Sequence, residues 1–177
     1  MTGVQTCALP ISNAAGFGAF EQALSRGLFS SALAVKGQIE GPITLSAYLF
    51  HNGQPFLADP ALFAAIAFHI SQIIAWQIDR LKSAGLPALL FIDEPALCLE
   101  APVGNAVSEE QRLQALTATP EDARIRGAHA DCTAAQRVPS SACAEPDIIS
   151  FDAHKRLDLF FADWHALDFM QQGGTVA

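Results

Sequence analysis

Acidic side chains directly follow two short apolar segments of this chain, and their position there is the first sign of chemistry. Asp93 and Glu94 come immediately after the run Ala88–Ile92, and Asp152 comes immediately after Asp147–Phe151. An apolar run of this length is typical of a buried parallel strand. Such a strand has no reason to end in adjacent carboxylates unless they face solvent or a ligand. We therefore expect Asp93 and Glu94 to contact a ligand, from opposite faces of the strand because successive strand residues alternate.

Three further residues carry possible chemistry, each with a simpler alternative. His129 and Cys132 form a candidate metal half-site, because imidazole and thiolate are ligands that zinc prefers, although a full site needs three or four ligands. A chance pair in an irregular segment explains the same two residues. Gln38 is expected at the end of a strand, where it either lines a site or only caps the turn at Gly41-Pro42. Asp152 either reaches a site or N-caps the helix that follows it.

Short apolar segments alternate with amphipathic helical segments along the chain, which predicts an α/β fold with parallel strands. More specifically, we expect an incomplete (β/α)8 TIM barrel, since polar residues at the carboxyl ends of barrel strands are usually site residues. The expected strands are Ala32–Val35, Ala88–Ile92, Asp147–Phe151 and a last one from Thr175. The expected helices are Phe17–Leu28, one from Ile43, one from Pro60 to Lys82, and His154–Gln172. Asp59 and Pro60 are expected to cap the third of these, and Ser108 to Gln111 fit a capping box. The last helix is expected to place Leu157, Phe160, Phe161, Trp164 and Leu167 on one face.

Three motifs in order resemble a known family. IDEPAL (Ile92–Leu97), KGQIEGPITL (Lys36–Leu45) upstream and PDIISFDAH (Pro146–His154) downstream are similar to the barrel of cobalamin-independent methionine synthases. They are still more similar to its shorter single-barrel relatives, in the superfamily that also contains uroporphyrinogen decarboxylase. The resemblance implies a barrel fold from about Phe20 to Ala177 and a methyltransferase that transfers a methyl group to a thiol such as homocysteine.

The resemblance also implies roles for individual residues. Asp93 matches an aspartate that binds the amino group of homocysteine, and Gln38 and Glu94 would line the substrate pocket. A zinc cofactor would hold the thiol as a thiolate. In the family a strand with a His-Cys motif supplies zinc ligands, so His129 and Cys132 are the candidates, and Asp152 is the nearest match to a zinc-binding glutamate. No catalytic residue beyond these binding groups is assigned.

Two segments do not fit this picture. Residues Met1–Ile11 can be read as the translation of a common sequencing adapter, so we expect an unstructured artefact there and a partial barrel domain at 12–177. A strand is due within Gly127–Glu145, yet that interval has no apolar run. We expect that Asp131 to about Cys143 is translated out of frame. With 177 residues, against the roughly 250 of a complete barrel, we expect a fragment that is truncated at both ends and inactive as given.

Composition excludes several classes of partner. The net charge of −8 argues against nucleic acid or an anionic membrane surface. No membrane span is expected, because polar residues interrupt the most apolar helix. The four cysteines have no regular spacing, which makes a reducing, cytoplasmic setting the default. The expected partner is a small-molecule thiol. The competing hypothesis is a barrel fragment of the same superfamily without metal, either non-catalytic or of the decarboxylase type.

Overall fold

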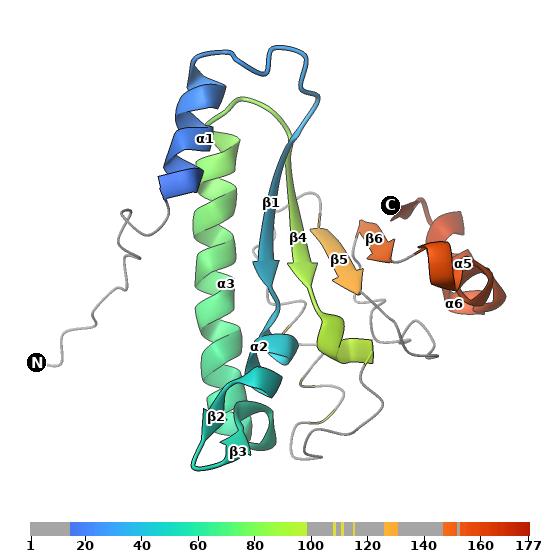
Figure 1. Cartoon of the computed structure of the whole chain (residues 1–177). Helices are drawn as coiled ribbons and strands as arrows, with labels where there is room; N and C mark the ends of the chain where they lie inside the picture. Colours follow the sequence, from blue (N-terminus) through green and yellow to red (C-terminus); the bar gives the residue numbers. More distant parts are fainter. Residues whose placement is uncertain are drawn as a thin grey trace, which may run out of the picture.

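The computed structural model describes residues 15–98, 108, 111, 115, 126–130, 147–151 and 153–177. Its main feature is a five-stranded sheet in the order β1-β4-β5-β6-β7, in which every neighbouring pair is parallel (Figure 1). The strands are β1 (Val35–Glu40), β4 (Ala88–Asp93), β5 (Arg126–Ala130), β6 (Ile148–Phe151) and β7 (Thr175–Val176). The strands follow one another across the sheet in chain order, which confirms the expected α/β class with parallel strands.

Helices connect and cover these strands. They are α1 (Ala15–Ser25), α2 (Pro42–Tyr48), α3 (Pro60–Lys82), α5 (Ala153–Ala162) and α6 (Trp164–Gln171). Between α2 and α3 lie the two-stranded hairpin of β2 (Phe50–His51) and β3 (Gln54–Pro55) and the 3-10 turn η2 (Phe56–Ala58). A second 3-10 turn, η3 (Pro95–Cys98), follows β4 directly. The crossover from β1 to β4 therefore runs through α3, and the crossover from β6 to β7 runs through α5 and α6.

Helix α3 forms where the sequence predicts it. Asp59 caps its N-terminus by accepting from the backbone N–H of Ala61 at 2.8 Å and of Leu62 at 3.3 Å, and Pro60 occupies the first turn. One side of the helix packs on the sheet through a core of Ile70, Ile74, Ile78, Leu90 and Ile92. Helix α1 lies beside α3, where Phe17 contacts Trp76 and Glu21 pairs with Arg80 at 2.7 Å (Figure 1).

The core between α3 and the sheet gives a first testable expectation. Ile74 is buried and packs in the cluster with Leu90 and Ile92. Removing one buried methylene in Ile74→Val should lower the free energy of unfolding by about 1 kcal/mol. The exposed Gln72→Ala on the same helix should change it by less than about 0.5 kcal/mol. Urea denaturation of both variants measures the difference, and equal effects would show that α3 is not docked through this side.

The first strand is displaced from its expected position. We predicted Ala32–Val35, but the strand is Val35–Glu40. An uninterrupted apolar run was expected, whereas the real strand alternates: Val35 and Gly37 are buried, and Lys36, Gln38 and Glu40 are exposed. Gly37 allows α3 to approach, because a Cβ there would lie 2.8 Å from atoms of Gln77 and Leu81. Gln38 is therefore a mid-strand residue and Glu40 ends the strand.

Strand β5 confirms a further expectation, and the C-terminal helices correct another. Strand β5 lies at the start of the interval where a strand was due, before Asp131, although no apolar run marks it. The single helix expected over His154–Gln172 is wrong, because the chain breaks at Asp163 into α5 and α6. The backbone carbonyl of Asp163 accepts from Ala166 and Leu167 and so starts the second helix. The break allows Phe160 from α5 and Ala166 from α6 to pack together on Ile149 of β6.

The predicted apolar face of this helical region is also wrong. Of the residues expected on it, Phe160 is buried, whereas Leu157, Phe161, Trp164 and Leu167 are exposed. A single stripe at helical spacing cannot follow one face when the axis changes direction at Asp163. By contrast, the capping box at Ser108 is confirmed: its hydroxyl accepts from the Gln111 N–H at 3.2 Å, and the Gln111 side chain accepts from the Ser108 N–H at 2.9 Å.

By length and composition, α3 is one helix of the described chain that could cross a membrane, with a mean hydropathy of 1.6 over its most apolar window. The core helix of a globular domain has the same length and composition, so this finding is weak evidence for a span. The sequence expectation that this helix does not span a membrane therefore stays a prediction.

Candidate functional site

The carboxyl ends of the strands place four residues in one row across the sheet. Glu40 pairs with Asp93, Asp93 pairs with His129, and His129 pairs with Ser150 in the parallel register. Residues that share a row in a parallel sheet belong to the same face. In the preceding row Ile39 pairs with Ile92, both of which belong to the face that α3 covers. The row from Glu40 to Ser150 therefore belongs to the opposite face, at the edge where site residues are expected.

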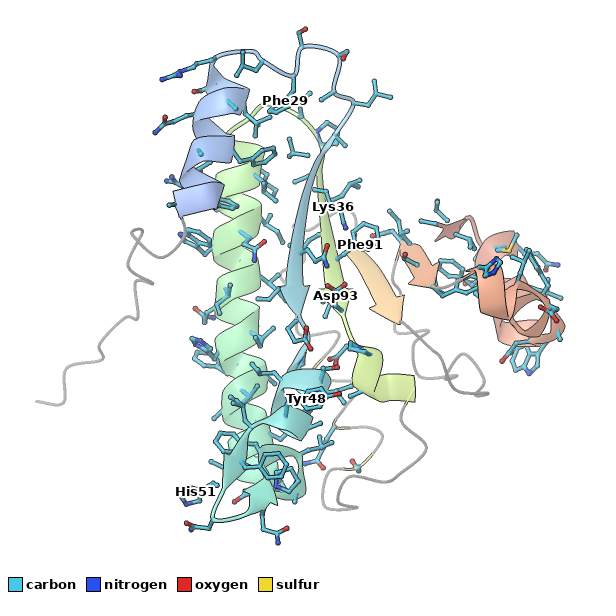
Figure 2. The ribbon with its side chains drawn as sticks, in the orientation of Figure 1. Phe29, Lys36, Tyr48, His51, Phe91 and Asp93 are labelled. Atoms are coloured by element: carbon cyan, nitrogen blue, oxygen red, sulfur yellow. The ribbon has the colours of Figure 1, made fainter. Side chains whose placement is uncertain are left out.

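On that face, a chain of side-chain hydrogen bonds links β1 to β4. The Lys36 ammonium donates to Gln38 Oε1 at 2.8 Å, and Gln38 Nε2 donates in turn to Asp93 Oδ2. Lys36 Nζ also lies 4.6 Å from the centre of the Phe91 ring, a favourable position for a cation. Figure 2 shows Lys36, Phe91 and Asp93 following one another along the two strands. The predicted site residues Gln38 and Asp93 thus contact each other.

The chemistry of its neighbours fixes the orientation of the Gln38 amide. An ammonium can only donate and an ionised carboxylate can only accept, so the amide oxygen faces Lys36 and the amide nitrogen faces Asp93. The second oxygen, Asp93 Oδ1, is buried and has no hydrogen-bond partner among the described residues. A buried acceptor without a partner is costly, and a donor supplied by a ligand would remove that cost.

Glu40 is a candidate residue that our reading of the sequence missed. Its register partner is Asp93, and the pKa of Glu40 is raised above its ordinary value by partial burial and by the negative charge of Asp93. The alternation of polar and apolar residues over Val35–Glu40 is the signal that would have identified it, since the strand then ends at Glu40.

Glu94 has a different environment from Asp93. Its side chain is 1% exposed, and its carboxylate lies against the N-terminus of α2. Oε1 accepts from the Ile43 N–H at 2.9 Å, and Oε2 accepts from the Thr44 N–H at 2.7 Å and from the Thr44 hydroxyl at 2.6 Å. Thr44 Oγ1 accepts in turn from the Ala96 N–H at 3.1 Å. Glu94 therefore caps α2 from a distant strand and ties this helix to the end of β4.

Glycine at the N-cap of α2 makes this arrangement possible. Gly41 has no side chain that could cap the helix, and a Cβ at this position would lie 2.2 Å from the Glu94 carboxyl carbon. The carboxylate thus fills the space above Gly41 and takes over the capping role. Burial raises the pKa of Glu94 to about 7; the hydrogen bonds from Thr44 and Ile43 oppose this shift, and the charge of Glu40 adds to it.

The predicted site residues are thus only partly brought together. Gln38 and Asp93 are in contact, whereas the Glu94 carboxylate is turned toward α2. Asp93 and Glu94 thus point in different directions, as expected for successive residues of a strand. His129 has a backbone position beside Asp93 in the sheet. Cys132 and Asp152 lie outside the described residues, as do Met1–Ile11 and the segment expected to be out of frame. Within the described residues no group of three or more potential metal ligands is found.

Comparisons with known proteins add no family assignment. No protein-family model matches the chain, and no curated protein or solved structure matches it significantly. The three motifs and the site geometry are therefore the basis for the function proposed below.

Proposed function

We propose that this chain is part of a (β/α)8 barrel of the methionine synthase type, which transfers a methyl group to a thiol such as homocysteine. The sequential order of the parallel strands supports the barrel, because each strand of such a barrel pairs with the next one in the chain. The packing of α3, α5 and α6 supports it further, since their core contacts fall on one face of the sheet in register, at Ile92 and Ile149.

The observation that carries the proposal is the state of the Asp93 carboxylate. Gln38 holds one oxygen, and the other is buried with no partner among the described residues. Glu40, which is opposite Asp93 in the register of the neighbouring strand β1, adds a second negative charge. A primary ammonium group supplies several donors and a positive charge, so it matches both features. Asp93 would thus bind and orient the amino group of a homocysteine-like substrate, and Glu94 would hold the adjoining turn rather than line the pocket.

Zinc remains a prediction for this protein. Of the predicted ligands, the described residues include only His129, placed by its backbone in β5. The described residues do not by themselves make a zinc donor set, and we assign no step of the reaction to the metal. A measurement of the zinc content of the purified protein separates the methyltransferase proposal from the alternative. Stoichiometric zinc favours the methyltransferase, and its absence favours a decarboxylase-type or non-catalytic barrel fragment.

The binding part of the proposal has its own test. L-Homocysteine at saturating concentration should raise the melting temperature of the protein, because a ligand that binds only the folded state stabilises it. Asp93→Asn removes the charge while keeping the shape, and it should weaken homocysteine binding roughly 10- to 100-fold. Asp79→Asn, on the exposed side of α3, removes one negative charge elsewhere and is the matched control.

Two outcomes would contradict this assignment. If homocysteine leaves the melting temperature of the unaltered chain unchanged, the chain does not bind the proposed substrate. If Asp93→Asn and Asp79→Asn bind homocysteine equally well, the ligand is held by other residues, and the role given to Asp93 is wrong.

A further inference from the structure

The hydrogen-bonded series Lys36–Gln38–Asp93, on the face of the sheet opposite α3, ends in opposite charges. Lys36 lies at one end and Asp93 at the other, and the neutral amide of Gln38 connects them. Lys36 is exposed, and an ammonium has three donors, of which Gln38 accepts one. Its position over the Phe91 ring holds the ammonium near this series instead of leaving it free in solvent. Among the described residues, Lys36 and Asp93 therefore both have hydrogen-bonding capacity beyond the Gln38 amide.

The Gln38 amide itself indicates what else would fit between these charges. Its oxygen accepts from the cation and its nitrogen donates to the anion, with both atoms bonded to one carbon. An α-amino acid also presents an acceptor and a donor close together, because its carboxylate and its ammonium are both attached to Cα, although its acceptor oxygen is one bond further from the donor than in the amide. The carboxylate would accept from Lys36, and the ammonium would donate to Asp93. Glu40, next to Asp93, would set the orientation of the amino acid. Its negative charge favours the ammonium beside Asp93 and repels the carboxylate from that position.

We propose that Lys36 is the carboxylate-binding residue of this site, so that Lys36 and Asp93 together select α-amino acid ligands in their zwitterionic form. This inference rests on the function proposed above and extends it from the amino group to the whole head group. It predicts that the site requires both charged groups of the ligand, and that a thiol with only one of them binds poorly.

Three probes and four proteins test the role of Lys36. The probes are L-homocysteine, 3-aminopropane-1-thiol, which lacks the carboxylate, and 4-mercaptobutanoate, which lacks the amino group. Calorimetric titration of the unaltered chain should show homocysteine binding at least about tenfold more tightly than either analogue, the scale of one lost charge-assisted hydrogen bond. Lys36→Met should lose the preference for homocysteine over 3-aminopropane-1-thiol, and Lys36→Arg should retain it. Lys82→Met, at the exposed end of α3, removes the same charge elsewhere and should behave like the unaltered chain.

The same titrations separate failure of this inference from failure of the proposed function. If homocysteine binds but Lys36→Met retains the preference over 3-aminopropane-1-thiol, Lys36 does not bind the carboxylate and this inference is overturned. If the unaltered chain binds homocysteine and 3-aminopropane-1-thiol equally, the carboxylate is not recognised and the inference is overturned as well. If the unaltered chain binds none of the probes, the proposed function fails and the inference fails with it. Melting temperatures without ligand show whether each variant is folded.

Discussion

Glu94→Gln is expected to remove much of the pH dependence of stability that the unaltered protein shows between about pH 4.5 and pH 7. Burial raises the pKa of this carboxyl from 4.5 to about 7 in the folded state. The folded protein therefore retains a proton in this range that the unfolded chain releases, and stability falls as the pH rises. A shift of this size corresponds to about 3 kcal/mol, and the loss is complete above pH 7.

The measurement is urea denaturation of both proteins from pH 5 to pH 8. Glutamine has nearly the shape of the protonated acid, but its NH2 group cannot accept from the Thr44 N–H as the hydroxyl oxygen of the acid can, so Glu94→Gln should be the less stable protein at pH 5. That gap should shrink by about 2.5 kcal/mol on going to pH 8, as the unaltered protein ionises Glu94. Asp79→Asn serves as the control for loss of an exposed charge. A gap that stays constant or widens with pH would contradict the cause assigned to the raised pKa.

The second large effect is expected from Gly41→Ala. The backbone of Gly41 is extended, with φ −77° and ψ 164°, and alanine adopts this conformation readily. The added methyl group is nevertheless placed 2.2 Å from the carboxyl carbon and Oε1 of Glu94, so this buried side chain must move. Overpacking and the loss of hydrogen bonds to α2 should together lower the free energy of unfolding by about 4 kcal/mol.

A double-mutant cycle separates this contact from a general backbone effect. In a Glu94→Ala background the carboxyl group is absent, so adding Gly41→Ala should cost about 1 kcal/mol or less. Gly16→Ala in α1, where no atom lies within 4 Å of the added methyl, should be neutral or slightly stabilising. Additive effects of Gly41→Ala and Glu94→Ala would disprove the contact between the two residues.

Several elements could be predicted because their signals are local. The Asp59-Pro60 cap, the apolar spacing of α3 and the run Ala88–Ile92 each depend on neighbours in the sequence, and each forms as expected. Strand β1 was displaced because only one of its faces is buried, which produces an alternating pattern instead of an apolar run. The break at Asp163 was missed because the residues on both sides have helical spacing, and only packing on Ile149 separates them.

In the candidate site, too, the features that depend on nearby residues were predicted, and those that depend on distant residues were missed. Gln38 and Asp93 were both expected at the ends of strands; the structure joins them by a hydrogen bond, although Gln38 lies within β1 and not at its end. The role of Glu94 was not visible in its own segment, since its partners Ile43 and Thr44 lie about fifty residues earlier in the chain. Glu40 was missed for a related reason, because its significance depends on its register with Asp93.

The sequence alone thus determined the class of fold, the helix caps at Asp59 and Ser108 and the presence of carboxylates at the ends of strands, because these caps and hydrophobic patterning depend on residues close in the chain. Tertiary structure decided which carboxylate has an oxygen without a hydrogen-bond partner among the described residues. Asp93 and Glu94 are adjacent and chemically similar, yet Asp93 accepts from Gln38 through one oxygen only, as far as the described residues show, whereas both oxygens of Glu94 accept from the N-terminus of α2. That difference arises from the alternation of strand faces together with the position of a helix that the sheet brings into contact.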